Sequence, residues 1–280
     1  MSGRRRPYAP FGRRSARVET VDHHGPYVVL TVIDSTGPRP LAGQFYMLRT
    51  AQAWGGGDDG RPYLPRALSF ARARADGDRL ALEFLLEAVG PGTARLAASA
   101  AGDELLIAGP FGNGFTFEAG RRPLLVAGGI GLAPIIALDD EIHDLDGVRS
   151  TILVGMRSGD HARAVIAYGL DHDLATDDGS AGQAGYVTQM LAAQLRAERE
   201  STVYACGPPA MLEAVRELCE AHDVPSQLAM ESGMACGFGA CFGCVVATRD
   251  GYARLCVDGP VLRGEQIETA LAAGTNGARP

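Results

Sequence analysis

Four cysteines near the C-terminal end of the chain have a spacing that constrains the local fold. Cys236, Cys241, Cys244 and Cys256 form the pattern C-x4-C-x2-C-x11-C, which is typical of the plant-type thiolate ligands of a [2Fe-2S] cluster. A short loop wraps one edge of such a cluster with three thiolates, and a following strand or hairpin supplies the fourth. A structural zinc site usually combines one short cysteine pair with a second short pair, and the second pair is missing here. The spacing therefore predicts a [2Fe-2S] cluster and electron transfer, with a zinc site or unrelated buried thiols as alternatives.

The residues between the cysteines support this prediction. Gly237, Gly239 and Gly243 permit positive φ angles and let backbone N–H groups approach the sulfur atoms. Apolar residues also surround the cysteines, and we expect them either to pack in the core or to form the edge of a partner interface. They are Met234, Phe238, Phe242, Val245 and Val246.

Composition predicts a cytoplasmic protein that has no membrane or nucleic-acid partner. Six cysteines in 280 residues do not form a disulfide framework, and thiols that bind iron are best kept in a reducing compartment. The sequence contains neither a long apolar segment nor a signal-peptide core. Residues 1–17 hold six arginines and no acidic residue, a pattern also found in nucleic-acid arms and transit peptides. The whole chain lacks lysine, however, and its net charge is -7, so we interpret residues 1–15 as a disordered tail.

The length suits two domains and an appendage. Strand-like segments at 27–33, 44–49, 67–71 and 80–86 are separated by Gly, Pro and Asp turns, which indicates a small β-barrel. A glycine-rich loop, residues 51–62, interrupts it, and Trp54 is either a lid or an anchor of that loop. After Pro123, expected strands at 124–127, 151–154 and 203–205 alternate with expected helices at 134–145, 187–197 and 210–222. This alternation predicts a Rossmann-like parallel sheet, and so a multidomain chain of all-β and α/β parts.

Two turns of that sheet are candidates for dinucleotide binding. The first, GGIGLAP, joins a strand to a helix, where glycines let a diphosphate approach the backbone and the helix N-terminus. It does not match G-x-G-x-x-G, so the prediction rests on its position between an expected strand and an expected helix. The second, ACGPP, ends a later strand at the same carboxyl edge, where ligands bind. Cys206 either touches a nicotinamide ring or is a small buried thiol. The expected contacts are Gly128, Gly129, Gly131, Cys206, Gly207 and Pro208.

The barrel carries two weaker motifs. In RALS, Arg66 and Ser69 offer a cation and a hydroxyl for a phosphate and a flavin edge. In VGPGT, Gly92 and Thr93 lie in a tight turn before a short expected helix. The segment GPFGNGF, residues 109–115, is a glycine-rich linker that joins the two domains, with a simple interdomain hinge as the alternative.

The order of these motifs over residues 16–268 resembles the electron-transfer subunit of class B, NAD-dependent dihydroorotate dehydrogenase, a branch of the ferredoxin reductase-like superfamily. The resemblance implies FAD, a [2Fe-2S] cluster and NAD as cofactors, and no catalytic side chain. It implies FAD contacts at Arg66, Ala67, Leu68, Ser69, Leu85, Leu86, Glu87, Gly92 and Thr93. It also implies that the four cysteines hold iron. Ala67 departs from the proline usual in the family, and the glycine-rich loop and basic tail are further departures.

The resemblance further implies three domains and a partner. Residues 16–115 would form the FAD-binding barrel, 116–225 the NAD-binding domain and 226–280 the cluster domain. The partner would be an FMN-containing catalytic subunit that oxidises dihydroorotate in pyrimidine biosynthesis, within a heterotetramer. The alternatives are the related module of an NAD(P)H:ferredoxin or sulfide oxidoreductase or of a hydrogenase, and a zinc-stapled NAD-binding regulator.

Two carboxylates favour NAD over NADP. NADP-specific members of the superfamily usually have serine and arginine where this chain has TDDG, residues 176–179. Asp177 and Asp178 would repel a 2′-phosphate but could accept a hydrogen bond from a ribose hydroxyl. Arg157 could compensate for part of that repulsion.

Overall fold

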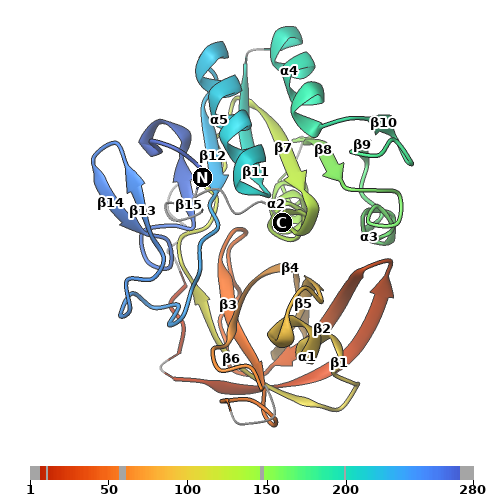
Figure 1. Ribbon diagram of the computed structural model, residues 1–280, viewed down its shortest axis with the longest axis vertical. Coiled ribbons are helices and arrows are strands. Elements are labelled where there is room, and N and C mark those ends of the chain that lie inside the picture. The colour runs from red at the N-terminus through yellow and green to blue at the C-terminus, as the bar shows by residue number, and fades with distance from the viewer. Residues whose placement is uncertain (1–6, 11, 57–60, 146–147, 199, 272–280) are drawn as a thin grey trace.

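The computed structural model describes residues 7–10, 12–56, 61–145, 148–198 and 200–271. A barrel lies at one end of the molecule, a helix-covered sheet at the other, and a small hairpin beside the sheet (Figure 1). The predicted combination of a β-barrel, a Rossmann-like sheet and a small C-terminal part is confirmed. Within the described residues, no helix is both long and apolar enough to cross a membrane.

The barrel closes through antiparallel pairing of neighbouring strands. Its strands, in spatial order, are β1 (Arg14–His24), β2 (Tyr27–Asp34), β5 (Arg79–Glu87), β4 (Arg66–Asp76), β3 (Phe45–Thr50) and β6 (Glu104–Phe111). The helix α1 (Pro91–Ala97) follows β5. Large side chains such as Tyr46 and Phe84 fill the interior, with their rings edge to face at 5.5 Å.

Two barrel strands were not predicted from sequence. Strand β1 contains few apolar residues and many charged or polar ones, so its alternation is weak. Strand β6 contains Gly109 and Pro110, which normally argue against a strand. The expected linker at 109–115 is therefore partly barrel strand. The residues after β6 contact the C-terminal part of the chain, where the backbone N–H of Asn113 donates to the carbonyl of Gly259 at 2.5 Å.

The second sheet has the order β10-β9-β8-β7-β11-β12-β15. All neighbours are parallel except β12 and β15. The strands are β7 (Arg122–Gly128), β8 (Thr151–Met156), β9 (His172–Thr176), β10 (Gln183–Ala184), β11 (Ser201–Cys206), β12 (Ser226–Ala229) and β15 (Val261–Arg263). The chain runs outward from β7 to β8 and β9 and then returns to β11. The topological switch point therefore lies between β7 and β11, where open α/β sheets bind ligands.

Helices cover both faces of this sheet. Figure 1 shows α2 (Leu132–His143) between the sheet and the barrel, and α4 (Val187–Ala197) and α5 (Pro209–His222) together on the other face. The short helix α3 (Arg163–Tyr168) lies near the barrel. The turns η1 (Gly129–Gly131) and η2 (Gly264–Gln266) are 3-10 helices.

Polar contacts hold the barrel against the sheet. Arg72 on β4 donates from Nε to Asp140 on α2 at 3.2 Å, and its guanidinium lies 5.0 Å from the ring centre of Tyr168 on α3. The backbone N–H of Ala42 donates to the carboxylate of Glu141 at 2.8 Å. Charged and cation–π contacts thus join the two parts.

The C-terminal part is built around the hairpin of β13 (Val245–Thr248) and β14 (Gly251–Arg254). It joins the neighbouring sheet through β15, which pairs with β12. The domain boundaries expected from sequence stay predictions. The strand β12, which those boundaries assign to the cluster domain, pairs in parallel with β11 of the second sheet. At the other end, Arg14 and Ser15 lie in β1 rather than in a tail. The expected disordered segment otherwise falls partly on residues 1–6 and 11, which lie outside the described residues.

Candidate functional site

A cavity of about 250 Å³ lies where the three parts of the chain meet. The barrel, the turns after β7 and β11, and the segment that follows β12 all contribute to its wall. Its lining includes Ala67, Leu68, Ser69, Leu85, Gly131, Cys206, Met230, Glu231, Ser232 and Met234. The fold therefore brings together residues from two predicted flavin segments and two predicted dinucleotide turns.

The two dinucleotide turns touch each other through their backbones. A Cβ atom on Gly131 would lie 2.6 Å from the amide nitrogen of Gly207, closer than real Cβ atoms approach. A Cβ on Gly207 would lie 3.0 Å from the Cα of Gly128. Gly129 has a φ of 53°, in the left-handed region. The glycines are needed for this close approach, and the turns lie beside the switch point of the sheet.

Cys206 and Glu231 are ionisable groups at the cavity wall. The Cys206 side chain is buried, and burial together with the charge of Glu231 raises the pKa of its thiol well above the ordinary value. Desolvation also raises the pKa of the Glu231 carboxyl, which borders the open cavity. Cys206 therefore remains a neutral thiol at pH 7, compatible with either role expected from sequence.

The second barrel motif lies beside the first. A Cβ atom on Gly92 would meet Nη2 of Arg66 at 2.6 Å, so the arginine packs directly on the start of α1. Thr93 uses its hydroxyl locally, accepting the backbone N–H of Gly90 at 3.1 Å. The Leu86 side chain is buried in the barrel core, and Glu87 faces the His161 ring at 4.0 Å.

The predicted cofactor residues thus divide into two groups. Six line the cavity, and the others lie outside its wall. Those outside are Arg66, Leu86, Glu87, Gly92, Thr93, Gly128, Gly129, Gly207 and Pro208. Four of these belong to the two touching turns, while Arg66 and Gly92 mark a second contact region on the barrel.

The four cysteines form two pairs. The sulfur atoms of Cys244 and Cys256 are 3.2 Å apart, and Cys236 interacts with the side chain of Cys241. Two thiolates on one tetrahedral metal ion at about 2.3 Å lie roughly 3.8 Å apart, somewhat farther than these two sulfur atoms. A [2Fe-2S] cluster places two ligands on each iron, so this donor set fits the cluster. Within the described residues, no group of three or more His, Cys, Asp or Glu side chains is arranged around a single ion.

Backbone N–H groups surround the sulfur atoms. Burial acts to raise the pKa of Cys236, but hydrogen bonds from the N–H groups of Phe238, Cys241 and Ala240 outweigh it and lower the pKa to about 6. The Cys241 sulfur also accepts the N–H of Gly243 at 3.4 Å. Such donors stabilise thiolate ligands and tune a cluster. By contrast, burial and the neighbouring Cys244 raise the pKa of Cys256 to about 12.

The cysteine loop packs on the barrel. Gly237 has a φ of 80°, and a Cβ on it would lie 2.6 Å from Cγ of Met47 on β3. Gly239 also has a positive φ, of 88°. Gly243 does not adopt a positive φ; the left-handed residue is its neighbour Phe242, with a φ of 58°. The loop therefore uses glycine where the barrel approaches, and turns at a phenylalanine where it faces solvent.

The apolar residues around the cysteines have two different environments. Val246 is buried and Met234 lines the cavity, whereas Val245 is half-buried. Phe238 and Phe242 are 63% and 62% exposed. The structure thus assigns Val246 to the core and leaves the two phenylalanine rings on the surface beside the cysteines.

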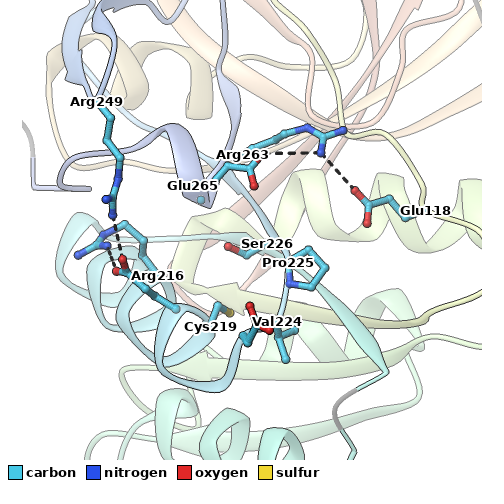
Figure 2. A pocket seen from close by; sticks show the side chains of 12 residues that line it. Glu118, Arg216, Cys219, Val224, Pro225, Ser226, Arg249, Arg263 and Glu265 are labelled. Atoms are coloured by element: carbon cyan, nitrogen blue, oxygen red, sulfur yellow. Dashed lines mark hydrogen bonds and ion pairs between the residues drawn. The ribbon is translucent and has the colours of Figure 1, made fainter.

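A second cavity, of about 350 Å³, lies where α5 meets the C-terminal part (Figure 2). Its arginines are paired with carboxylates. Arg216 contacts Glu220 at 2.7 Å, Arg249 contacts the same carboxylate at 3.0 Å, and Arg263 lies 3.9 Å from Glu118. The Arg249 pair joins the turn of the β13–β14 hairpin to α5, and the Arg263 pair joins β15 to the segment before β7.

The carboxyl edge beyond β9 carries the two aspartates. Both are exposed, and the Asp178 carboxylate accepts the N–H and hydroxyl of Ser180 at 2.9 and 2.6 Å, which lowers its pKa. Tyr186, 64% exposed, precedes α4 at the same edge, where the Gly185 N–H donates to the Thr176 carbonyl.

Sequence reasoning missed Tyr186 and Glu231. Glu231 comes two residues after the end of β12, so its position at the carboxyl edge of a strand was a usable signal. Tyr186 follows a glycine-rich turn, and nothing local distinguishes it from a loop residue.

Comparison with known proteins agrees with this architecture. Residues 231–268 match the iron-sulfur cluster binding domain of dihydroorotate dehydrogenase B, and residues 125–217 match the oxidoreductase NAD-binding domain. The NADH-dependent reduced ferredoxin-NADP oxidoreductase structure, solved in work on flavin-based electron bifurcation, aligns with a TM-score of 0.77 at 22% identity, covering 96% of this chain and 92% of that one. The ferredoxin reductase of carbazole 1,9a-dioxygenase aligns with a TM-score of 0.64 at 24% identity, covering 76% and 66%. These two structures establish the similarity of fold.

Curated relatives are more similar in sequence. The electron transfer subunit of dihydroorotate dehydrogenase B (NAD(+)) from Clostridium acetobutylicum is 37% identical over 227 residues, 80% of this chain and 85% of the relative. A homolog of that subunit from Aquifex aeolicus is 36% identical over 201 residues, 70% and 78% of the two chains. This chain belongs to the family of electron transfer subunits of dihydroorotate dehydrogenase B.

Proposed function

We propose that this chain transfers electrons between NAD(H) and the FMN of a separate dihydroorotate dehydrogenase catalytic subunit, and that it holds FAD and a [2Fe-2S] cluster of its own. The observation that carries the proposal is the cavity shared by the barrel, the NAD-type sheet and the segment leading to the cysteines. The relatives' names state an electron transfer subunit of an NAD(+)-linked dehydrogenase. When bound, FAD supplies the conversion between two-electron hydride chemistry and the one-electron chemistry of the cluster.

Each part of the chain contributes a separate function. Arg66 at Gly92 provides a cation for the FAD diphosphate, and the backbone of β4 from Ala67 to Ser69 lines the flavin end of the site. The turn after β7 offers the N-terminus of α2 to the dinucleotide. Cys206 excludes water from the cavity wall beside it. The cavity lined by Ala67, Ser69 and Cys206, and the packing of Arg66 on Gly92, support these proposed roles.

Two residues add to the expected site. Glu231, whose carboxyl has a raised pKa, offers a hydrogen-bonding group at the cavity wall. Tyr186 offers an exposed ring beside Asp177 and Asp178, suited to stacking against an adenine. The two carboxylates favour a ribose hydroxyl over a 2′-phosphate, so NAD is the proposed nicotinamide cofactor.

The cysteine loop is the proposed exit for electrons. Cys236, Cys241, Cys244 and Cys256 would hold the iron atoms, with backbone N–H groups directed at the sulfurs. The exposed rings of Phe238 and Phe242 beside them form an apolar surface suited to the catalytic subunit. We assign residues 16–115 to FAD, 116–225 to NAD and 226–280 to the cluster. Reduced thiols favour a cytoplasmic location, and a heterotetramer is the expected complex.

Reconstitution tests the proposal. Purified anaerobically, the protein should contain one FAD, about two irons and two sulfides per chain and give an S = 1/2 EPR signal on reduction. Alone it should reduce artificial acceptors with NADH and show no dihydroorotate oxidation. Mixed with the catalytic subunit from the same source, it should couple dihydroorotate oxidation to NAD reduction. A colourless protein with stoichiometric zinc, or a complex formed only with a ferredoxin-linked or sulfide-linked flavoenzyme, contradicts the proposal.

A further inference from the structure

The loop between β3 and β4 carries the only tryptophan of the chain. Trp54 lies among glycines, yet its side chain is only 8% exposed and packs on the barrel core. The backbone N–H groups of Gly55 and Gly56 donate to the Pro62 carbonyl at 2.9 and 3.3 Å. These hydrogen bonds hold the residues just after Trp54 against the end of the loop. A glycine-rich segment thus holds a large aromatic ring in a defined place.

The ring of Trp54 contacts Arg66. The guanidinium carbon lies 5.8 Å from the centre of the indole ring, within the range of a cation–π contact, for which tryptophan is the best partner. Gly92 borders the same guanidinium, since a Cβ there would lie 2.6 Å from Nη2. Nη1 of Arg66 also donates to the Leu64 carbonyl at 2.5 Å. The indole and these contacts confine the arginine side chain.

Trp54 also carries an unused donor. Its Nε1 is buried and has no hydrogen-bond partner among the residues that the structure describes. A buried donor without an acceptor is unfavourable. Indole nitrogens normally find a partner when they are buried, so this atom points to a ligand or ordered water that supplies an acceptor.

We propose that Trp54 is a positioning residue of the FAD site. Its indole holds the Arg66 guanidinium at Gly92, in the orientation that binds the cofactor's diphosphate. Its Nε1–H then donates to an acceptor that arrives with FAD, either a cofactor atom or a bridging water. The inference rests on the proposed FAD site at Arg66 and adds a residue outside the motifs that indicated that site. Because the guanidinium is confined before FAD arrives, less side-chain entropy is lost on binding.

FAD titration of flavin-free protein tests the inference. Since Trp54 is the sole tryptophan, its emission reports on this site, and calorimetry supplies Kd for variants that lack it. Trp54→Leu, which removes the ring face, should weaken FAD binding about tenfold, and Trp54→Phe, which keeps a weaker face, about threefold. Gln52→Ala, an exposed side chain in the same loop, is the control and should leave Kd unchanged.

A double-mutant cycle separates positioning from general support of the fold. In an Arg66→Ala background, Trp54→Leu should change Kd less than twofold, because the indole acts through the arginine. An equal effect in both backgrounds overturns the inference. So does a tryptophan emission that FAD leaves unchanged in the wild-type protein, a readout that needs no variant to fold. Wild-type protein that binds no FAD contradicts the proposed function as well, whereas normal FAD binding with no Trp54 effect overturns this inference alone.

Discussion

Replacing Gly131 with alanine tests whether contact between the two dinucleotide turns sets the position of the nicotinamide. The new Cβ would lie 2.6 Å from the Gly207 amide nitrogen and also meet the Cys206 carbonyl, whereas ordinary contacts begin at 3.4 Å. The obstructing atoms belong to the backbone, so no side-chain rotation relieves the clash. The turns must move apart by about 1 Å, and a displacement of that size near reacting atoms can lower a rate about 100-fold. The overpacking itself should reduce stability by about 1–3 kcal/mol.

Anaerobic stopped-flow reduction of the bound FAD by NADH measures this effect. The limiting rate for Gly131→Ala should fall about 100-fold, while FAD content and the EPR signal of the cluster stay at wild-type values. Gly233→Ala is the matched control, because a Cβ there meets no atom within 4 Å and no positive φ strains it. A Gly131→Ala protein that retains both cofactors and is reduced within threefold of the wild-type rate would refute the reasoning.

Four further predictions concern the cluster, the cofactor, the partner and acid stability. Cys241→Ser should abolish the EPR signal of the cluster and leave FAD reduction by NADH nearly unchanged; loss of both would show that the cluster also supports the flavin site. The wild-type kcat/KM should be higher for NADH than for NADPH. Asp177→Arg should raise the kcat/KM for NADPH about tenfold, because the arginine attracts the 2′-phosphate that the aspartate repels. A wild-type preference for NADPH would overturn the assignment of NAD. Phe238→Glu should weaken association with the catalytic subunit at least tenfold in calorimetry while iron content is kept, whereas charging the distant exposed Ile166 should not. Burial opposes ionisation of Asp34, but the Arg14 side chain lowers the pKa of its carboxyl overall. The ion pair therefore stabilises the fold fully above the unfolded pKa of about 4, and this stabilisation is lost as pH falls further. Asp34→Asn should lower the free energy of urea unfolding by about 3 kcal/mol at pH 7, and the difference from wild type should narrow toward pH 3.

Local sequence patterns predicted four of the six barrel strands and three of the seven strands of the second sheet. Helix α4 was predicted with the bounds 187–197 that it has in the structure, because its apolar residues recur at helical spacing. Strands β2 and β5 were equally clear, because both are rich in apolar residues. Strand β1 was missed because it contains few apolar residues and is held in the barrel by its pairing with β2 and β6. The pairing of β15 with β12 was also missed.

The cysteine spacing and the glycine turns indicated a cluster and a dinucleotide, whereas FAD followed from the family resemblance. Four thiolates within a short segment, and glycine turns between strand and helix, place donor atoms by local geometry, so the cysteine pattern and GGIGLAP were visible before any folding. Their cofactor roles follow from the family and stay predictions at the level of single residues.

Only the tertiary structure decided which of these segments meet. The packing of Gly131 on the turn after β11, the place of Glu231 at the cavity and the contact of Trp54 with Arg66 join residues far apart in sequence or on different elements. Such contacts depend on how the barrel, the sheet and the hairpin pack together, and no local spacing records that packing. The sequence by itself therefore indicated which kinds of cofactor to expect, and the tertiary structure determined which side chains meet at the candidate site.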